Sequence, residues 1–125
     1  MANWTEDELR TIADANELRI APVRRNGELR SPTTIWGVRA GDDVFVRAAY
    51  GPRTGWYRVA TTSRQARVRA DGVERDVTVE DADPGMLDAV DAAYREKYAR
   101  FPANVVNSVV ADDARQRTLR LVPRS

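Results

Sequence analysis

Aromatic and arginine side chains gather between Arg47 and Arg58, at the end of one expected strand and in the loop that follows it. Aromatic rings stack on flat ligands, and guanidinium groups bind phosphate or carboxylate through paired hydrogen bonds. Loops that are held by a sheet often carry binding residues. We therefore predict a groove for a planar anionic ligand. The residues expected to line it are Trp36, Arg47, Tyr50, Arg53, Trp56, Tyr57 and Arg58.

The same side chains also have structural interpretations. Large aromatic residues usually pack in a core or an interface, which would account for Trp36, Trp56 and Tyr57. Arg47 and Arg53 could hold a phosphate. Arg47 lies among apolar neighbours and needs either an anion or an acidic partner if it is buried. The sequence is equally consistent with a salt bridge to an acidic helix residue, Asp42 or Asp43.

The chain contains no cysteine and no histidine. Disulfides, thiolate nucleophiles, histidine-based triads and zinc-finger sites are therefore excluded within it, and we predict no metal site. Tyr94, Lys97 and Tyr98 could suggest acid/base chemistry, because a nearby lysine can lower the pKa of a phenol. Both tyrosines also fit the apolar stripe of a helix, so packing is the favoured interpretation.

The 125 residues carry 20 basic and 19 acidic side chains, for a net charge of +1. This length fits a single domain spanning residues 1–125. The near balance of charge argues against a nucleic-acid or membrane-surface partner. No apolar run approaches the length of a membrane span, so we expect a cytoplasmic protein.

The N-terminal two thirds of the chain predicts a helix followed by antiparallel strands. Thr5 and Glu8 have the spacing of a capping box, which predicts a helix over 5–14. Barrel strands are expected within 17–81, and the run from Thr33 to Val38 is expected to form one of them. The pairs Asn26-Gly27 and Asp71-Gly72 are typical of tight hairpins.

The second hairpin can be checked by counting outward from Asp71-Gly72. A two-residue turn sets Arg69 opposite Glu74 and Arg67 opposite Asp76, so opposite charges face each other twice. We expect both pairs to lie on the solvated face of the sheet.

The C-terminal third predicts a long helix before the last strand. Asp83-Pro84 is a typical helix start, and apolar residues at spacings of three and four continue the helix over 84–101. The segment 104–110 fits a helix or a strand, and 116–122 is expected to be the last strand. Only one helical turn is expected after Trp56. The whole chain thus predicts a mainly β (α+β) fold, a six-stranded antiparallel split β-barrel with a short N-terminal helix and a longer helix before the last strand.

These motifs resemble the split-barrel flavin and deazaflavin reductases. The resemblance rests on Arg30-Ser31-Pro32-Thr33, the turn at Gly41-Asp42, the strand end Val46-Arg47-Ala48-Ala49-Tyr50-Gly51 and then Trp56-Tyr57-Arg58. That superfamily includes deazaflavin-dependent nitroreductases and pyridoxamine-phosphate oxidase-like proteins. Nearly the whole chain is similar to a compact bacterial family of unknown function placed in it.

The resemblance implies a cofactor, flavin mononucleotide (FMN) or a deazaflavin coenzyme, and a homodimer. Carried over from the nitroreductases, the implied groove residues are Arg30, Thr33, Ala48, Ala49, Gly51, Trp56 and Tyr57. Three functions remain open: an oxidoreductase that acts by hydride transfer, a cofactor-free binding or accessory protein, and a non-redox enzyme acting on a biosynthetic metabolite. The catalytic residues and the substrate are left unassigned.

Overall fold

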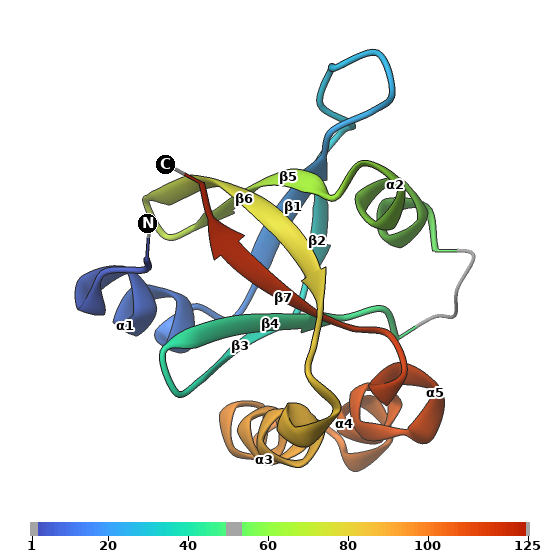
Figure 1. The fold of residues 1–125 in the computed structure, drawn as a ribbon. Helices are drawn as coiled ribbons and strands as arrows, with labels where there is room; N and C mark the ends of the chain where they lie inside the picture. The colour runs from blue at the N-terminus through green and yellow to red at the C-terminus, as the bar shows by residue number, and fades with distance from the viewer. Residues whose placement is uncertain (1–2, 50–53, 125) are drawn as a thin grey trace.

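The computed structural model of the chain describes residues 3–49 and 54–124. Seven strands form one antiparallel sheet in the order β2-β1-β5-β6-β7-β4-β3, which curls into a nearly closed barrel (Figure 1). The strands are β1 (Leu18–Pro22), β2 (Thr33–Ile35), β3 (Gly37–Ala40), β4 (Asp43–Arg47), β5 (Gln65–Ala70), β6 (Val73–Asp81) and β7 (Thr118–Pro123). The helices are α1 (Glu6–Asp14), α2 (Gly55–Ser63), the 3₁₀ helix η1 (Pro84–Met86), α3 (Leu87–Lys97), α4 (Ala103–Val110) and α5 (Asp112–Arg115).

The predicted split-barrel fold is confirmed, but the predicted number of six strands was wrong. The run that was expected to form one strand divides at Trp36 into β2 and β3. β2 pairs with β1, where Ile35 lies opposite Leu18, whereas β3 pairs with β4, where Gly37 lies opposite Val46. The chain therefore turns at Trp36 to pass from one end of the sheet order to the other, and this turn brings the barrel to near closure.

Local sequence signals account for the N-terminal helix and for one hairpin. Both hydrogen bonds of the capping box between Thr5 and Glu8 are present at the start of α1. In the β5–β6 hairpin, Asp71 and Gly72 have φ values of 44° and 91°, as this tight turn requires. The predicted pairs follow, with Arg69 opposite Glu74 and Arg67 opposite Asp76, and both form salt bridges.

The turn at Asn26-Gly27 differs from the predicted two-residue hairpin. Gly27 has a φ of +88°, but Asn26 is not among the described residues with positive φ. Hydrogen bonds join the Gly27 amide to the Arg24 carbonyl and the Arg24 amide to the Glu28 carbonyl. The result is a longer loop, which projects from the barrel between β1 and β2 (Figure 1). Its extra length moves Arg24 and Arg25 out of any strand.

The helices after β4 also differ from their predicted bounds. α2 has nine residues instead of one turn, and the segment 104–110 lies within α4 and is helical. The helix predicted over 84–101 begins as η1, where Asp83 accepts a hydrogen bond from the Gly85 amide, and ends as α3 at Lys97. α5 was not predicted. Among the described residues, no helix has the length and apolar character needed to cross a membrane.

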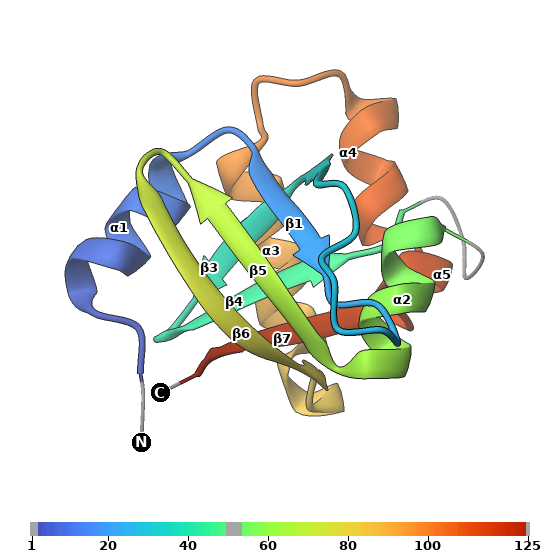
Figure 2. The same ribbon diagram turned by 90° about the horizontal axis from the view of Figure 1, so that it is seen from above.

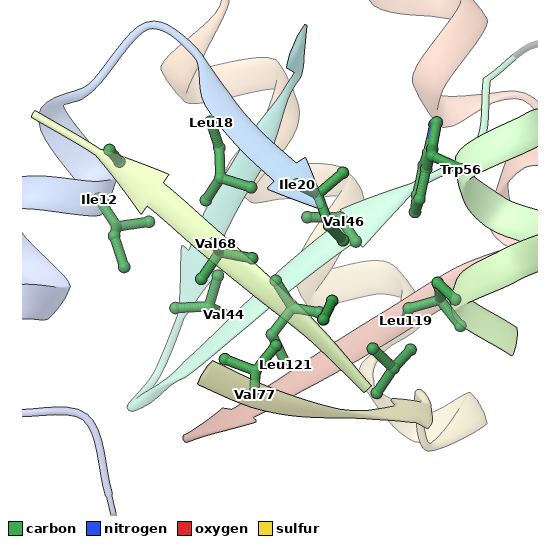
Figure 3. Packing of buried hydrophobic residues seen from close by; sticks show 14 of the residues in the cluster. Ile12, Leu18, Ile20, Val44, Val46, Trp56, Val68, Val77, Leu119 and Leu121 are labelled. Atoms are coloured by element: carbon green, nitrogen blue, oxygen red, sulfur yellow. The ribbon is translucent and has the colours of Figure 1, made fainter. Parts of the chain in front are cut away.

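Two apolar clusters fix the position of these elements. The first fills the barrel, with Ile12 of α1 and Trp56 of α2 at opposite ends of the labelled side chains (Figure 3). The second lies between the outer face of β3 and β4 and the helices α3 and α4; it contains Phe45, Tyr94 and Tyr98. α3, α4 and α5 therefore form one layer on the barrel, while α1 and α2 lie on opposite sides of it (Figures 1 and 2).

Candidate functional site

A small cavity, which we call the aromatic hollow, lies between the barrel and α4. Its volume is about 300 Å³. The barrel contributes Trp36 and the β2 residues before it, and Ala49 follows β4. Trp56 comes from the first turn of α2, and α4 contributes two valines and a serine. The lining residues are Glu17, Thr33, Thr34, Ile35, Trp36, Arg47, Ala49, Thr54, Trp56, Val105, Ser108 and Val109. The indole rings and the valines give this hollow a mainly apolar wall.

Trp36 presents a half-buried ring to the hollow because the second apolar cluster supports it from behind. Its indole stacks on Tyr98 with ring centroids 3.9 Å apart and an interplanar angle of 4°. Phe101 packs against the same indole at 5.0 Å. The Tyr94 hydroxyl donates a hydrogen bond to the Trp36 carbonyl at 2.9 Å, so the backbone is fixed as well. A ring held in this way can receive a flat ligand with little loss of side-chain freedom.

A larger cleft, which we call the arginine cleft, lies between the β1–β2 loop and α2. Its volume is about 730 Å³. The loop contributes Arg24 and Arg25, Arg30 precedes β2, and Arg58 comes from α2. The remaining lining residues are Val23, Gly27, Gly55, Val59, Thr62, Ser63 and Gln65. The described lining therefore carries four positive charges and no carboxylate.

These four arginines gather in one cleft whose described lining contains no carboxylate. Eight arginines elsewhere form salt bridges with carboxylates: Arg39, Arg47, Arg64, Arg67, Arg69, Arg75, Arg115 and Arg120. Within the described ranges, Arg24, Arg25, Arg30 and Arg58 form no ion pair. Among the described residues, Arg10, Arg19, Arg95, Arg100, Arg117 and Arg124 also form no salt bridge, so the clustering of the four is their distinguishing feature. Clustered guanidinium groups repel one another unless an anion lies among them, so this arrangement favours an anionic ligand.

Arg30 lies at the boundary between the hollow and the cleft. It lines the cleft, and its Nη1 donates a 3.0 Å hydrogen bond to the hydroxyl of Thr33, which lines the hollow. On the α2 side, Gly55 lines the cleft and the adjacent Trp56 lines the hollow. The two cavities therefore adjoin through residues that are in contact or consecutive, and one ligand could occupy both.

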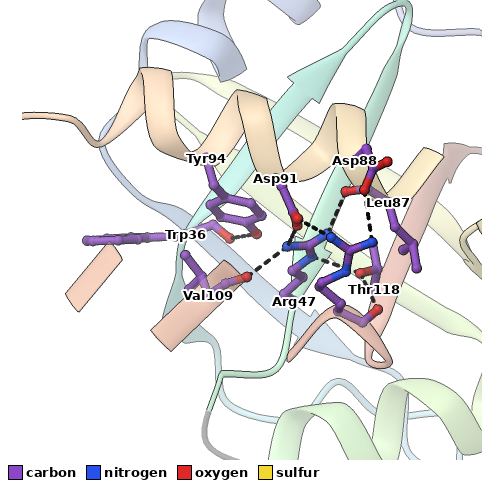
Figure 4. Close-up of polar contacts among 9 residues, drawn as sticks. Trp36, Arg47, Leu87, Asp88, Asp91, Tyr94, Val109 and Thr118 are labelled. Atoms are coloured by element: carbon purple, nitrogen blue, oxygen red, sulfur yellow. Dashed lines mark hydrogen bonds and ion pairs between the residues drawn. The ribbon is translucent and has the colours of Figure 1, made fainter. Parts of the chain in front are cut away.

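Arg47 serves the helical layer instead of the arginine cleft. Its side chain is fully buried and pairs with Asp91 of α3 at 2.5 Å. Its Nε donates to the Thr118 hydroxyl at 2.8 Å, and its other contacts are the carbonyls of Val109 at 2.8 Å and Leu87 at 3.1 Å (Figure 4). The alternative of a salt bridge to an acidic helix residue is thus the arrangement found. With these bonds made inside the protein, we do not assign Arg47 to ligand binding.

The other predicted site residues are divided between the core, the two cavities and the part of the chain outside the described residues. Ala48 is 1% exposed and belongs to the barrel core. The Tyr57 ring forms a T-shaped pair with Trp56, with ring centroids 6.0 Å apart, and it lines neither cavity. The predictions for Tyr50, Gly51 and Arg53 lie outside the described residues.

Tyr94, Lys97 and Tyr98 occupy structural positions. The Tyr98 hydroxyl donates to the Asn16 carbonyl at 2.9 Å, and Lys97 Nζ donates to the carbonyls of Ile12 at 2.9 Å and Gly37 at 2.6 Å. Burial raises the pKa of both tyrosines and lowers the pKa of Lys97 to about 8. These contacts join α3 to α1 and β3, which agrees with the packing interpretation.

Sequence reasoning missed Arg24 and Arg25, together with the valines of α4. The two arginines are adjacent in the sequence and lie close to Arg30, which is a local concentration of positive charge. Nothing local, however, indicates that their loop faces α2. The contribution of α4 was equally hidden, because the sequence fitted either a helix or a strand there.

Comparison with known proteins supports the fold and gives a family. Residues 8–121 match the model of a family described as "Uncharacterized protein conserved in bacteria". No curated protein sequence matches the chain. Among solved structures, a conserved hypothetical protein from Mycobacterium tuberculosis is similar with a TM-score of 0.70 at 12% identity, over 98% of this chain and 82% of its own.

Two further solved structures are of proteins whose function is described. HutZ, the heme storage protein from Vibrio cholerae, is similar with a TM-score of 0.64 at 14% identity, over 96% of this chain and 90% of HutZ. An F420 reductase is similar with a TM-score of 0.59 at 17% identity, over 98% of this chain and 97% of the reductase. At these identities the likeness establishes a shared fold.

Proposed function

We infer that this chain, which belongs to the DUF2255 family of bacterial proteins, binds a flavin-type ligand across the aromatic hollow and the arginine cleft. In this proposal the whole chain acts as one domain. The observation that carries the proposal is the group of four arginines without a carboxylate partner beside a cavity lined by two indoles. A flavin nucleotide has the matching parts, a flat ring system joined to an anionic tail.

The aromatic hollow suits the ring system. Its volume of about 300 Å³ is at the lower end of the range for ligand cavities, so it can take a ring system while the rest of a nucleotide extends outside. Trp36 offers a ring supported by Tyr98, and Val105 and Val109 of α4 add to the apolar lining. The Thr33 and Ser108 hydroxyls can form hydrogen bonds with polar edges of the ring.

The arginine cleft suits the anionic tail. Arg24, Arg25 and Arg58 are exposed and can adjust to a phosphate, whereas Arg30 is half-buried and already held by Thr33. Guanidinium groups bind phosphate in a paired geometry that lysine cannot reproduce. The protein would contribute affinity and orientation through these contacts.

Haem is the competing planar ligand, because HutZ shares this fold. Haem iron is most often held by histidine or cysteine, and this chain has neither. The buried phenols of Tyr94 and Tyr98 already donate to backbone carbonyls. These facts favour a flavin-type ligand over haem.

When bound, a flavin or deazaflavin supplies hydride-transfer chemistry, and the chain would act as an oxidoreductase. The chain's own residues would then orient the ring against Trp36 and exclude water from one face of it. If a ligand binds without redox turnover, the chain is instead a binding or accessory protein. The homodimer implied by the resemblance is a separate expectation, which light scattering can test.

Titration of the purified protein with FMN, reduced deazaflavin coenzyme and haem tests the proposal, with tryptophan fluorescence as the signal. We expect FMN or the deazaflavin to quench the fluorescence saturably, because Trp36 and Trp56 line the hollow. Affinity should fall with added salt, since the cleft is exposed. Arg58→Gln should weaken binding, whereas Arg67→Gln, an exposed arginine on the β5–β6 face, is the matched control. Absence of saturable quenching by either flavin would refute the proposal.

A further inference from the structure

Gly55 occupies a position where its backbone does not require glycine. It is the first residue of α2, and its φ lies outside the left-handed region that favours glycine. Glycine destabilises a helix relative to alanine, because it loses more backbone freedom on folding. A reason for glycine at this position must therefore come from its surroundings.

The Arg30 guanidinium lies directly over Gly55. A Cβ atom built on Gly55 would be 3.2 Å from Arg30 Cζ and 3.7 Å from its Nε, and it would be closer still to Nη2. Nonbonded atoms do not approach so closely, so any side chain at position 55 must displace the guanidinium. The other end of the same group is held by Thr33 through Nη1. The guanidinium thus lies between the Thr33 hydroxyl and the Cα atom of Gly55.

We propose that Gly55 is a positioning residue because it leaves the space in which Thr33 holds Arg30, at the junction of the two cavities, and that Arg30 there selects phosphorylated over unphosphorylated flavin. This inference rests on the proposed function, which brings the ring and the tail of one ligand to that junction. Arg30 differs from Arg24, Arg25 and Arg58 in being half-buried, and its guanidinium is oriented by the hydrogen bond to Thr33. A fixed guanidinium discriminates between ligands better than a mobile one, because it cannot adjust to a ligand without the anion.

The first experiment measures thermal stability without any ligand, using Gly55→Ala, Arg30→Ala and the double variant. With Arg30 present, alanine at 55 gains helix propensity but meets the guanidinium. In the Arg30→Ala background the guanidinium is absent, so only the gain in helix propensity remains. We expect Gly55→Ala to raise the melting temperature by about 2–6 °C more in the Arg30→Ala background than in the wild-type chain. Equal shifts in both backgrounds would overturn the contact between the two residues.

The second experiment compares the affinities of FMN and riboflavin, which differ by the phosphate. Loss of one charge-assisted hydrogen bond should lower the FMN preference of Gly55→Ala by about 10-fold or more, with riboflavin affinity retained. Gly85→Ala is the matched control, since a Cβ there would meet only Asp83 Oδ1, at 3.4 Å. It should leave the preference unchanged.

The outcomes separate the inference from the proposed function. If the wild-type protein binds neither ligand, the proposed function fails and the selective role of Arg30 fails with it, although the stability comparison still reports on the contact. If both ligands bind and Gly55→Ala leaves the FMN preference intact, the inference alone is overturned. A lower preference together with unequal melting shifts supports both parts of it.

Discussion

Replacing Asp91 with asparagine should destabilise this protein strongly, because it leaves a buried guanidinium without its carboxylate. The side chain of Arg47 is 0% exposed and that of Asp91 is 7% exposed. After the change, Arg47 would keep only neutral partners, the Thr118 hydroxyl and the carbonyls of Leu87 and Val109. Removing one partner of a buried ion pair costs about 3–5 kcal/mol.

Replacing Arg47 instead of Asp91 should lower the stability less, because Asp91 has a second cationic partner. Arg115 also pairs with Asp91 and is 26% exposed, so the carboxylate would remain compensated in Arg47→Met. We expect a loss of roughly 2–3 kcal/mol for that variant. The double variant should lose roughly 1–3 kcal/mol less than the sum of the single losses, because the two residues are in direct contact.

Urea denaturation followed by circular dichroism measures these losses. A loss of 3–5 kcal/mol corresponds to a midpoint shift of about 1.5–2.5 M for a small domain. Arg69→Met is the matched control, because Arg69 and Glu74 form an arginine–carboxylate pair with side chains 64% and 42% exposed. The expected cost of breaking that pair is about 0.2–1 kcal/mol. If Asp91→Asn costs no more than this control, the argument that the buried guanidinium depends on Asp91 is refuted.

Three further predictions concern titration and turn geometry. Burial raises the pKa of Tyr94 and Tyr98, so both phenols should stay protonated at about pH 11 in the native state and ionise only on unfolding. The stability of the fold should therefore fall as pH rises above about 10. Phenolate absorbance at alkaline pH measures both the ionisation and the unfolding that accompanies it. Burial lowers the pKa of Lys97 to about 8, so between about pH 8 and 10 the unfolded chain binds more protons than the folded chain. The stability of the fold should therefore rise with pH over that window. This rise should be absent in Lys97→Met. Gly72→Ala should lower stability by about 1 kcal/mol, because φ is +91° there, as judged by thermal melting.

Local signals predicted the parts of the fold that depend on neighbouring residues. The Thr5 capping box and the Asp71-Gly72 turn fix backbone geometry within a few residues, so both α1 and the register of β5–β6 followed from the sequence. The length of α2 did not follow from local signals in the sequence. Its last turn contains Thr61, Thr62 and Ser63, which are weak helix formers. In the structure their hydroxyls donate to carbonyls four residues earlier, which the sequence does not reveal.

The candidate site was predicted in part, for a related reason. Trp36, Trp56 and Arg58 were recognised because aromatic and basic residues cluster near the end of β4. Arg47 looked like a ligand residue, since the sequence cannot show that α3 brings Asp91 against it. The two arginines of the β1–β2 loop were missed because only the folded chain brings that loop opposite α2. Long-range packing, not residue type, decided each of these assignments.

The division at Trp36 has a consequence for the motions of the barrel. β2 and β3 stand at the two ends of the sheet order, and the pairings among the described strands include no ladder between them. Between β2 and β3 the barrel is therefore held together only by the covalent chain and by side-chain contacts. It can open there while β5, β6 and β7 stay paired. Amide deuterium exchange should therefore be faster in β2 than in β6. A ligand bound against Thr33, Ile35 and Trp36 would slow that exchange. Ligand binding would then make the whole barrel more rigid.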